Sequence, residues 1–212
     1  MCGRYKLSAV HKDVLKHFDL IDGKFDHEPN EEIFPGEEIL AVNSSRRAKK
    51  IFWTIEDCDN SGKLQRAINA KSETLTKVDM FRDAFKNGRV LIPATGFYEW
   101  KDMPNRKKAR YEFTFDEPLF AFAGVSRECE IKGETKDCGV ILTTEANDVV
   151  RPIHAKNRMP VILHKYDYEK WLDPDTSLEE LRRMMKPIPN DEIRTKEVDE
   201  PIKEGLLPLF DE

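Results

Sequence analysis

The cysteine at the second position, in the opening stretch MCGRY, can present two nucleophilic groups on one residue. Cells commonly remove an initiator methionine when the next side chain is small. Removal of Met1 would leave Cys2 with a free α-amine and a thiol on one residue, with ordinary pKa values of about 7.7–8.0 and about 8.5. Both groups would be partly nucleophilic at neutral pH. On position alone, however, a small buried residue is the ordinary interpretation of Cys2.

Asn69 and Glu99 are of types that assist a nucleophile. Asn69, in INAKSETL, either satisfies buried backbone groups or orients an amine or a substrate hydroxyl. Glu99, in GFYEW, shares one face of an expected strand with Phe97, while Tyr98 and Trp100 face the other way. Its carboxyl group is therefore either partly buried, with a raised pKa suited to acid–base chemistry, or exposed on an edge strand. The sequence leaves both alternatives open.

His154 lies in a predicted loop just before a strand, in the stretch PIHAKNRMPVIL. A lone histidine is more often structural than catalytic. Lys156 and Arg158 would lower its pKa, which suits a group that gains and loses a proton during a reaction. The chain has five histidines without HxH or HExxH spacing, so we expect no metal site and no cofactor.

Several cations lie within a few residues of these candidates. They are Arg4, Lys71, Arg82 and Arg158. With Trp53 and Trp100 they would form a cationic groove with stacking platforms, which single-stranded nucleic acid binding requires. The net charge of −5 argues against wrapping of nucleic acid over the whole surface, but not against such a groove. The basic runs at 46–50 and 105–110 are more typical of solvated turns.

The composition is that of a globular chain that builds its own core. Its 212 residues are 39% hydrophobic and 35% charged, which suits one domain covering 1–212. No apolar run has the length of a membrane span and no signal peptide opens the chain, so we expect a cytoplasmic protein. The cysteines (Cys2, Cys58, Cys129 and Cys138) form no CxxC pair, which indicates neither a zinc site nor a disulfide framework.

Short apolar runs predict most of the elements that position the candidates. YEFTF, LFAFAGV, GVILTT and MPVIL are rich in β-branched or aromatic residues and predict strands, as do VLI and FYEW. Helices are expected around 78–85, at 166–172 and from Ser177, which has capping-box spacing to Glu180. We therefore predict an α+β domain with a mostly antiparallel, curved or barrel-like sheet and flanking helices. The segment from about 187 is a packed or loose tail.

Six stretches together resemble the SRAP family, the SOS response-associated peptidases or abasic-site-processing proteins. In order, they are MCGRY, INAKSETL, RVLIPATGFYEW, LFAFAGV, ILTTEAN and IHAKNRMPVIL. The resemblance implies binding to abasic sites in single-stranded DNA during the DNA damage or SOS response. It also implies a lyase-type crosslinking enzyme that removes its own Met1 as a peptidase does, although a cellular aminopeptidase would give the same product. The Cys2 amine would condense with the lesion's aldehyde, and the thiol would close a thiazolidine ring.

The resemblance also assigns roles to individual residues. Cys2 would be the nucleophile, Asn69 would position its amine and the lesion, Glu99 would act as acid–base at the amine, and His154 would help open the sugar ring. The phosphates would be held by Arg4, Lys71 and Arg158, and Trp53 would stack on the bases or wedge between them. One difference is that three residues separate His154 from Arg158, where the family usually has one.

Three other classes of function remain open from the residues alone. An N-terminal-nucleophile hydrolase would use Cys2 to attack an amide, with its own amine as the base. A thiol peptidase would combine Cys2 with His154 and with Asn69 or Glu99. A single-strand binding module would need no reactive cysteine. The hydrolases predict amide turnover without DNA, and the module predicts binding without a covalent product.

Overall fold

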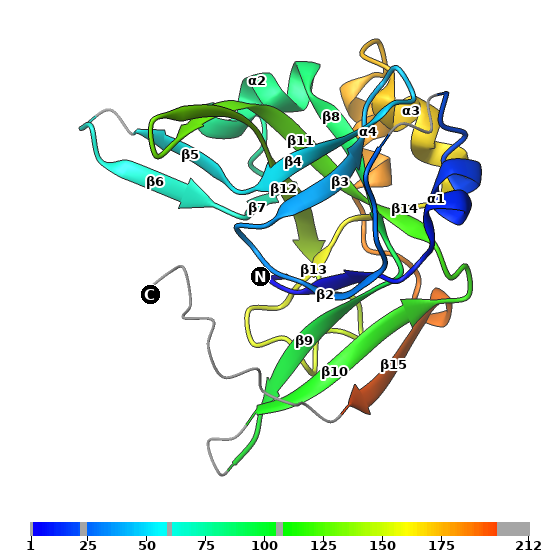
Figure 1. Ribbon diagram of the computed structural model, residues 1–212. Coiled ribbons are helices and arrows are strands. Elements are labelled where there is room, and N and C mark those ends of the chain that lie inside the picture. Colours follow the sequence, from blue (N-terminus) through cyan, green and yellow to red (C-terminus); the bar gives the residue numbers. More distant parts are fainter. Residues whose placement is uncertain (1, 22–24, 59–60, 105–107, 199–212) are drawn as a thin grey trace.

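Two large β-sheets share one core, and a two-stranded sheet of β5 (Ile55–Cys58) and β6 (Leu64–Ala67) extends from it (Figure 1). The computed structural model describes residues 2–21, 25–58, 61–104 and 108–198. The first half contains β1 (Tyr5–Leu7), α1 (His11–His17), β2 (Asn30–Ile33), β3 (Glu38–Val42), β4 (Ala48–Trp53), β5 (Ile55–Cys58), β6 (Leu64–Ala67), β7 (Asn69–Lys71), α2 (Asp79–Asn87), β8 (Arg89–Ala94) and β9 (Gly96–Asp102). The second half contains β10 (Lys108–Phe115), β11 (Phe120–Ile131), β12 (Glu134–Glu145), β13 (Arg158–Pro160), β14 (Ile162–Leu163), α3 (Tyr168–Leu172), α4 (Leu178–Met184) and β15 (Ile193–Val198).

The larger sheet closes on itself. Its strands follow the order β13-β12-β4-β3-β8-β11-β14, and β11 also pairs with β12. Strands β12, β4, β3, β8 and β11 therefore form a closed barrel. Most pairs are antiparallel, whereas β4 and β7 run parallel to β12. The prediction of a mostly antiparallel, barrel-like α+β fold is confirmed.

The smaller sheet packs against this barrel. Its order is β15-β10-β9-β1-β2, so β9 is an inner strand between β10 and β1. Tyr5 of β1 meets Trp53 of β4 and Phe122 of β11 edge-on, with ring centroids 5.2 and 5.6 Å apart. All three side chains are fully buried. Burial of each large apolar side chain contributes roughly 1.5–3 kcal/mol, so these rings hold the two sheets together.

The predicted helices are confirmed at α2, α3 and α4. Helix α2 buries Phe81, Ala84 and Phe85, which recur at the spacing of one helical face. Helix α4 begins after Ser177, whose hydroxyl accepts the backbone N–H of Glu180 at 3.2 Å. No helix among the described residues is long and apolar enough to cross a membrane.

The chain from about 187 packs as far as the structure describes it. After a 3₁₀ turn at Asn190–Glu192, β15 pairs with β10 from Ile193 opposite Phe115 to Val198 opposite Arg110. The stretch GLLPLF, for which we expected packing, lies outside the described residues.

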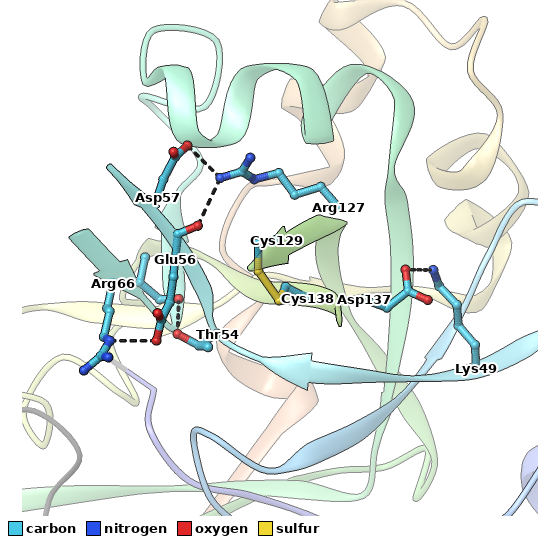
Figure 2. Close-up of a disulfide and its surroundings, with 10 residues drawn as sticks. Lys49, Thr54, Glu56, Asp57, Arg66, Arg127, Cys129, Asp137 and Cys138 are labelled. Carbon is cyan, nitrogen blue, oxygen red and sulfur yellow. Dashed lines mark hydrogen bonds and ion pairs between the residues drawn. A yellow bond between two sulfur atoms is a disulfide. The ribbon is translucent and has the colours of Figure 1, made fainter. Parts of the chain in front are cut away.

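A disulfide joins Cys129 of β11 to Cys138 of β12 (Figure 2). The cysteine spacing did not indicate a disulfide framework, and that interpretation was wrong for this pair. Cys129 lies opposite Lys136 and Cys138 opposite Arg127, so the two cysteines are diagonal neighbours on one face of the hairpin. Beside them Arg127 binds Asp57 at 2.6 Å and anchors the β5–β6 arm, which extends away from the barrel in Figure 1.

Candidate active site

Cys2 is fixed at the start of the chain rather than frayed. The carbonyl of Arg4 accepts the N–H of Tyr98 at 2.9 Å, and the next residue enters β1 between β2 and β9. The Cys2 side chain is fully buried, with its Sγ 3.8 Å from the Arg4 carbonyl oxygen. Burial raises the pKa of the thiol, and the neighbouring Glu99 charge raises it further. The thiol is therefore protonated at neutral pH.

Glu99 is buried, which excludes the exposed-edge alternative. It lies on inner strand β9, on the core-facing side with Phe97, whose ring stacks on Phe113 at 4.8 Å. Only 4% of Glu99 is exposed, and burial raises its pKa to about 8. Its Oε1 has no hydrogen-bond partner among the described residues. A protonated carboxyl with an unused oxygen is suited to proton transfer near neutral pH.

His154 lies beside Glu99, with 3.6 Å between its Nε2 and Glu99 Oε2. Its Nδ1 accepts the backbone N–H of Arg158 at 3.1 Å, so in the neutral ring the hydrogen is on Nε2 and points to Glu99. Burial lowers the pKa of His154 to about 4, and the charges of Lys156 and Arg158 add to this shift. The imidazole is therefore neutral and acts as an N–H donor at Nε2.

The three residues between His154 and Arg158 form a tight turn. Asn157 takes the left-handed conformation, with φ at 53°, and its N–H donates to the His154 carbonyl at 2.9 Å. Asparagine tolerates this region better than most residues. The turn returns the Arg158 backbone to the imidazole, so the longer spacing leaves His154 at the site.

Asn69 presents an unused acceptor. Strand β7 pairs with β12, and Asn69 Nδ2 donates to the Ile141 carbonyl at 3.3 Å. The residue is 8% exposed, and its Oδ1 has no partner among the described residues. Trp53 anchors the residue before this strand, because its Nε1–H donates to the Ile68 carbonyl at 2.9 Å.

The burial of Trp53 contradicts the prediction that this side chain stacks on DNA bases. The indole is fully buried and packs on Tyr5, so it would have to leave the core to stack on a base. Trp100, by contrast, is half-buried on the other face of β9 from Glu99. The predicted alternation along GFYEW is confirmed.

The predicted cations lie at three places. Lys71 is exposed and opposite Thr143 of β12. Arg158 donates to the Thr143 carbonyl at 2.6 Å and to both carboxylate oxygens of Glu73 at 2.7 and 2.9 Å. Arg4 follows Cys2 and lies over Phe34, with Cζ 3.8 Å from the ring centre.

Arg82 lies on α2, where its partners are Asp79 and Asp83 of the same segment. It therefore belongs to the helix surface rather than to the group around Cys2.

Sequence reasoning missed two carboxylates that hold these arginines. Glu73 belongs to INAKSETL, so its place beside Lys71 was a usable signal. Glu32, which binds Arg4 at 2.7 Å, lies in a polar stretch without a recognisable pattern. Among the described residues, no group of His, Cys, Asp and Glu side chains converges to hold a metal ion.

Residues 1–204 match the family model for SOS response associated peptidase (SRAP). The abasic site processing protein YoaM of Bacillus subtilis is 34% identical over 209 residues, which cover 93% of this chain and 91% of that protein. The abasic site processing protein HMCES of Gallus gallus is 30% identical over 156 residues, which cover 62% of this chain and 46% of that protein.

A solved structure from Bacteroides thetaiotaomicron shares the fold, with a TM-score of 0.80 at 23% identity and coverage of 93% and 92% of the two chains. A second, from Bordetella bronchiseptica, has a TM-score of 0.78 at 23% identity, with 93% and 100% covered. The family model spans almost all of the sequence, a range that includes Cys2, Asn69, Glu99 and His154. The chain belongs to the SOS response associated peptidase (SRAP) family.

Proposed function

We propose that this protein binds abasic sites in single-stranded DNA and forms a covalent thiazolidine crosslink through Cys2 once Met1 is removed. The observation that carries the proposal is the buried Cys2 beside the Glu99–His154 pair, whose facing atoms are 3.6 Å apart. The abasic site processing protein YoaM matches 93% of this chain and HMCES matches 62%. These matches support abasic sites as the substrate of this protein as well. We expect the protein to act in the cytoplasm, on the nucleoid, and to shield the lesion from cleavage.

The reaction has two covalent steps. The Cys2 amine adds to the aldehyde of the ring-opened sugar, and loss of one water leaves an imine with a C=N bond. The thiol then adds to the imine carbon, forming a C–S bond, while its proton moves to the nitrogen. The thiol does not need to be ionised beforehand, because the protonated imine is a strong electrophile. An imine alone hydrolyses, whereas ring closure by sulfur retains the adduct.

The neighbouring side chains provide the proton transfers. Glu99, with a pKa of about 8, donates the proton that lets water leave the carbon and accepts one when the reaction reverses. His154 presents its Nε2–H to the sugar ring oxygen as the ring opens. Oδ1 of Asn69 and Oε1 of Glu99, which have no hydrogen-bond partner among the described residues, accept N–H groups of the amine. Arg4, Lys71 and Arg158 bind phosphates, and Trp100 stacks on a base.

The raised pKa of Cys2 disfavours the hydrolase alternatives. A thiol peptidase uses a thiolate, which needs a lowered pKa from a cation or a base in contact with sulfur. Here burial and the Glu99 charge raise the pKa, and the one hydrogen bond of Sγ among the described residues is to a carbonyl. Release of Met1 is the single peptidase event that we propose, by self-cleavage or by an aminopeptidase.

A denaturing gel with abasic and intact oligonucleotides tests the proposal. Wild type should give a heat-stable adduct with the abasic strand alone, with the mass of both partners less one water. Cys2→Ala and Cys2→Ser should give none, because neither closes a sulfur ring. Cys58→Ala removes the exposed free thiol and is the matched control, which should react as wild type does. Stable crosslinking by Cys2→Ala, or Met1 retained in active protein, would refute the mechanism.

A further inference from the structure

The disulfide lies in a hairpin whose register does not depend on it. Strands β11 and β12 are joined by Lys132 and Gly133, which both take the left-handed conformation, with φ at 53° and 82°. Two such residues form a type I′ turn, whose twist matches that of the strands and sets their pairing. The register holds the Cα atoms of Cys129 and Cys138 6.1 Å apart, a separation at which the bond forms without backbone movement. The pair therefore stays poised for oxidation when it is reduced.

The two cysteines differ in exposure, and each lies opposite a cation. Cys129 is 8% exposed, whereas Cys138 is fully buried, so an incoming thiolate attacks Sγ of Cys129. Lys136 lies opposite Cys129 and Arg127 lies opposite Cys138, on one face of the hairpin. Lys136 also pairs with Glu134 at 3.3 Å. Cations beside a cysteine favour its thiolate, which is the form that exchanges with disulfides.

The root of the β5–β6 arm lies at this disulfide (Figure 2). Gly139, the residue after Cys138, forms a bridge with Thr54, the residue before β5. Arg127, opposite Cys138, donates to the carboxylate of Asp57 at 2.6 Å and to the backbone carbonyl of the preceding residue at 3.3 Å. The arm is thus held by the neighbours of Cys138, both along β12 and across the hairpin.

The returning strand of the arm leads into the candidate active site. Strand β6 ends at Ala67, whose carbonyl accepts the Thr54 hydroxyl at 3.3 Å. The next carbonyl, that of Ile68, accepts Nε1–H of Trp53 at 2.9 Å, and β7 then begins at Asn69. The residues that enter the arm therefore hold the residues that leave it. A change at the root of the arm reaches Asn69 through one peptide bond.

We propose that Cys129 and Cys138 form a redox modification site, at which exchange with a low-molecular-weight thiol opens the disulfide and loosens the root of the arm and, with it, Asn69. The inference rests on the proposed function for its cytoplasmic setting. Disulfides of cytoplasmic proteins are usually transient or redox-sensing, because that compartment keeps thiols reduced. A pair that the hairpin holds ready to close in such a compartment is suited to a switch.

The exchange has two balanced steps. One small thiolate bonds to Sγ of Cys129, the S–S bond breaks, and Cys138 leaves as a thiolate. A second small thiolate then attacks the attached sulfur, which leaves as a small disulfide and releases Cys129. Two small thiols are oxidised, the protein disulfide gains two electrons, and the two cysteines take up the protons that the small thiols lost. An excess of small disulfide drives the reverse steps and restores the bond.

A redox titration tests the site itself, in Cys58→Ala protein that lacks the exposed free thiol. Mixtures of reduced and oxidised glutathione are quenched with N-ethylmaleimide, and peptide mass spectrometry measures the alkylated fraction of Cys129 and Cys138. Both should be alkylated in excess reduced glutathione, and both should be protected again in excess oxidised glutathione. A bond that survives a large excess of reduced glutathione, or one that does not re-form, would overturn the proposal.

Hydrogen exchange tests the effect on the arm. Backbone amides of β5, β6 and β7 should exchange at least about tenfold faster in the reduced protein, because the arm opens locally. Amides of β9 and β10, in the smaller of the two large sheets, should not change and are the internal control. Cys129→Ala/Cys138→Ala should match the reduced protein in either glutathione mixture, and thermal melting confirms that it is folded. Arg127→Gln keeps both cysteines but lacks the anchor, so its arm should exchange fast in both states. Equal exchange in the oxidised and reduced protein would overturn the proposal.

The redox site and the proposed function fail in different ways. Crosslinking is compared between oxidised wild type, with Cys2 confirmed as a free thiol by mass, and Cys129→Ala/Cys138→Ala. Both are assayed without reductant, since small thiols also add to aldehydes. The double variant should crosslink the abasic strand roughly tenfold more slowly, because Asn69 is held less firmly. Equal rates would overturn the effect on Asn69.

If the disulfide opens and re-forms and the arm responds while wild type gives no crosslink, the redox site stands and the covalent chemistry does not. If wild type crosslinks while the disulfide resists glutathione, the proposed function stands and the redox site does not.

Discussion

Glu99 and Glu112 are two buried carboxylates on neighbouring strands of one sheet, with opposite environments. They are 4% and 5% exposed. Glu99 of β9 faces the core, has an oxygen without a partner among the described residues, and has a pKa raised to about 8 by burial. Glu112 of β10 faces outward and pairs with Lys6 and with Lys196, the latter at 2.8 Å. Burial acts to raise the pKa of Glu112, but hydrogen bonds from Lys196 and Lys6 outweigh it and lower the pKa.

We infer from this difference that Glu112 stabilises the fold and that Glu99 takes part in the proposed reaction. A buried carboxylate with two cationic partners is stabilised as an anion and has no reason to exchange its proton. A buried carboxyl whose pKa is raised by burial keeps its proton at neutral pH and costs the protein free energy when it ionises. Such a cost is retained where a reaction needs the group, which supports the assignment of Glu99 as the acid–base residue.

The largest expected effect is on the rate of crosslinking in Glu99→Gln. A positioned acid or base contributes roughly 10²–10⁴-fold, and glutamine keeps the shape of the side chain but has no acidic proton to transfer. Rates of adduct formation on an abasic oligonucleotide should fall by that factor, while Glu112→Gln should react as wild type does. Equal rates for wild type and Glu99→Gln would show that the two carboxylates do not differ in function.

The pH dependence of stability should have opposite signs at the two carboxylates. Because the pKa of Glu99 is raised, the folded protein holds a proton between pH 4.5 and about 8 that the unfolded chain has lost. Its contribution to stability is thus largest below pH 4.5 and is lost as the pH rises to about 8. Glu112, with a lowered pKa, contributes stability above pH 4.5 that is lost as the pH falls.

His154 limits the pH range in which the contribution of Glu99 to stability can be measured. Its pKa is lowered from 6.5 to about 4, so its contribution is present above pH 6.5 and is lost as the pH falls toward 4. Between pH 6.5 and 8 Glu99 titrates without it. Urea unfolding across that range should show wild type losing up to about 1.4 kcal/mol per pH unit relative to Glu99→Gln. Parallel curves for the two proteins would mean that Glu99 is already ionised at pH 6.5.

The sequence was sufficient to predict the faces of the strands, and its candidates Glu99 and His154 lie side by side in the fold. Alternation along GFYEW placed Glu99 with Phe97 and Trp100 on the other side, because the pleat of a strand is local. The sequence was not sufficient to predict contacts that depend on which strands pair. The Cys129–Cys138 disulfide requires the register of β11 on β12, and the burial of Trp53 requires closure of the barrel. The protonation pattern of His154 follows from a turn whose path residue types alone did not specify.

The smallest expected effect is the stability loss in Glu112→Gln, about 1–2 kcal/mol. The substitution removes an anion from Lys6, whose other carboxylate partner among the described residues is the exposed Glu31 at 3.6 Å. The loss is modest because Lys196 is 70% exposed and water solvates it readily. A double-mutant cycle with Lys6→Met isolates the interaction, and we expect a coupling free energy of about 1 kcal/mol from urea unfolding. A coupling near zero would show that burial of Glu112 is tolerated without its lysines, and its contrast with Glu99 would then not depend on charge pairing.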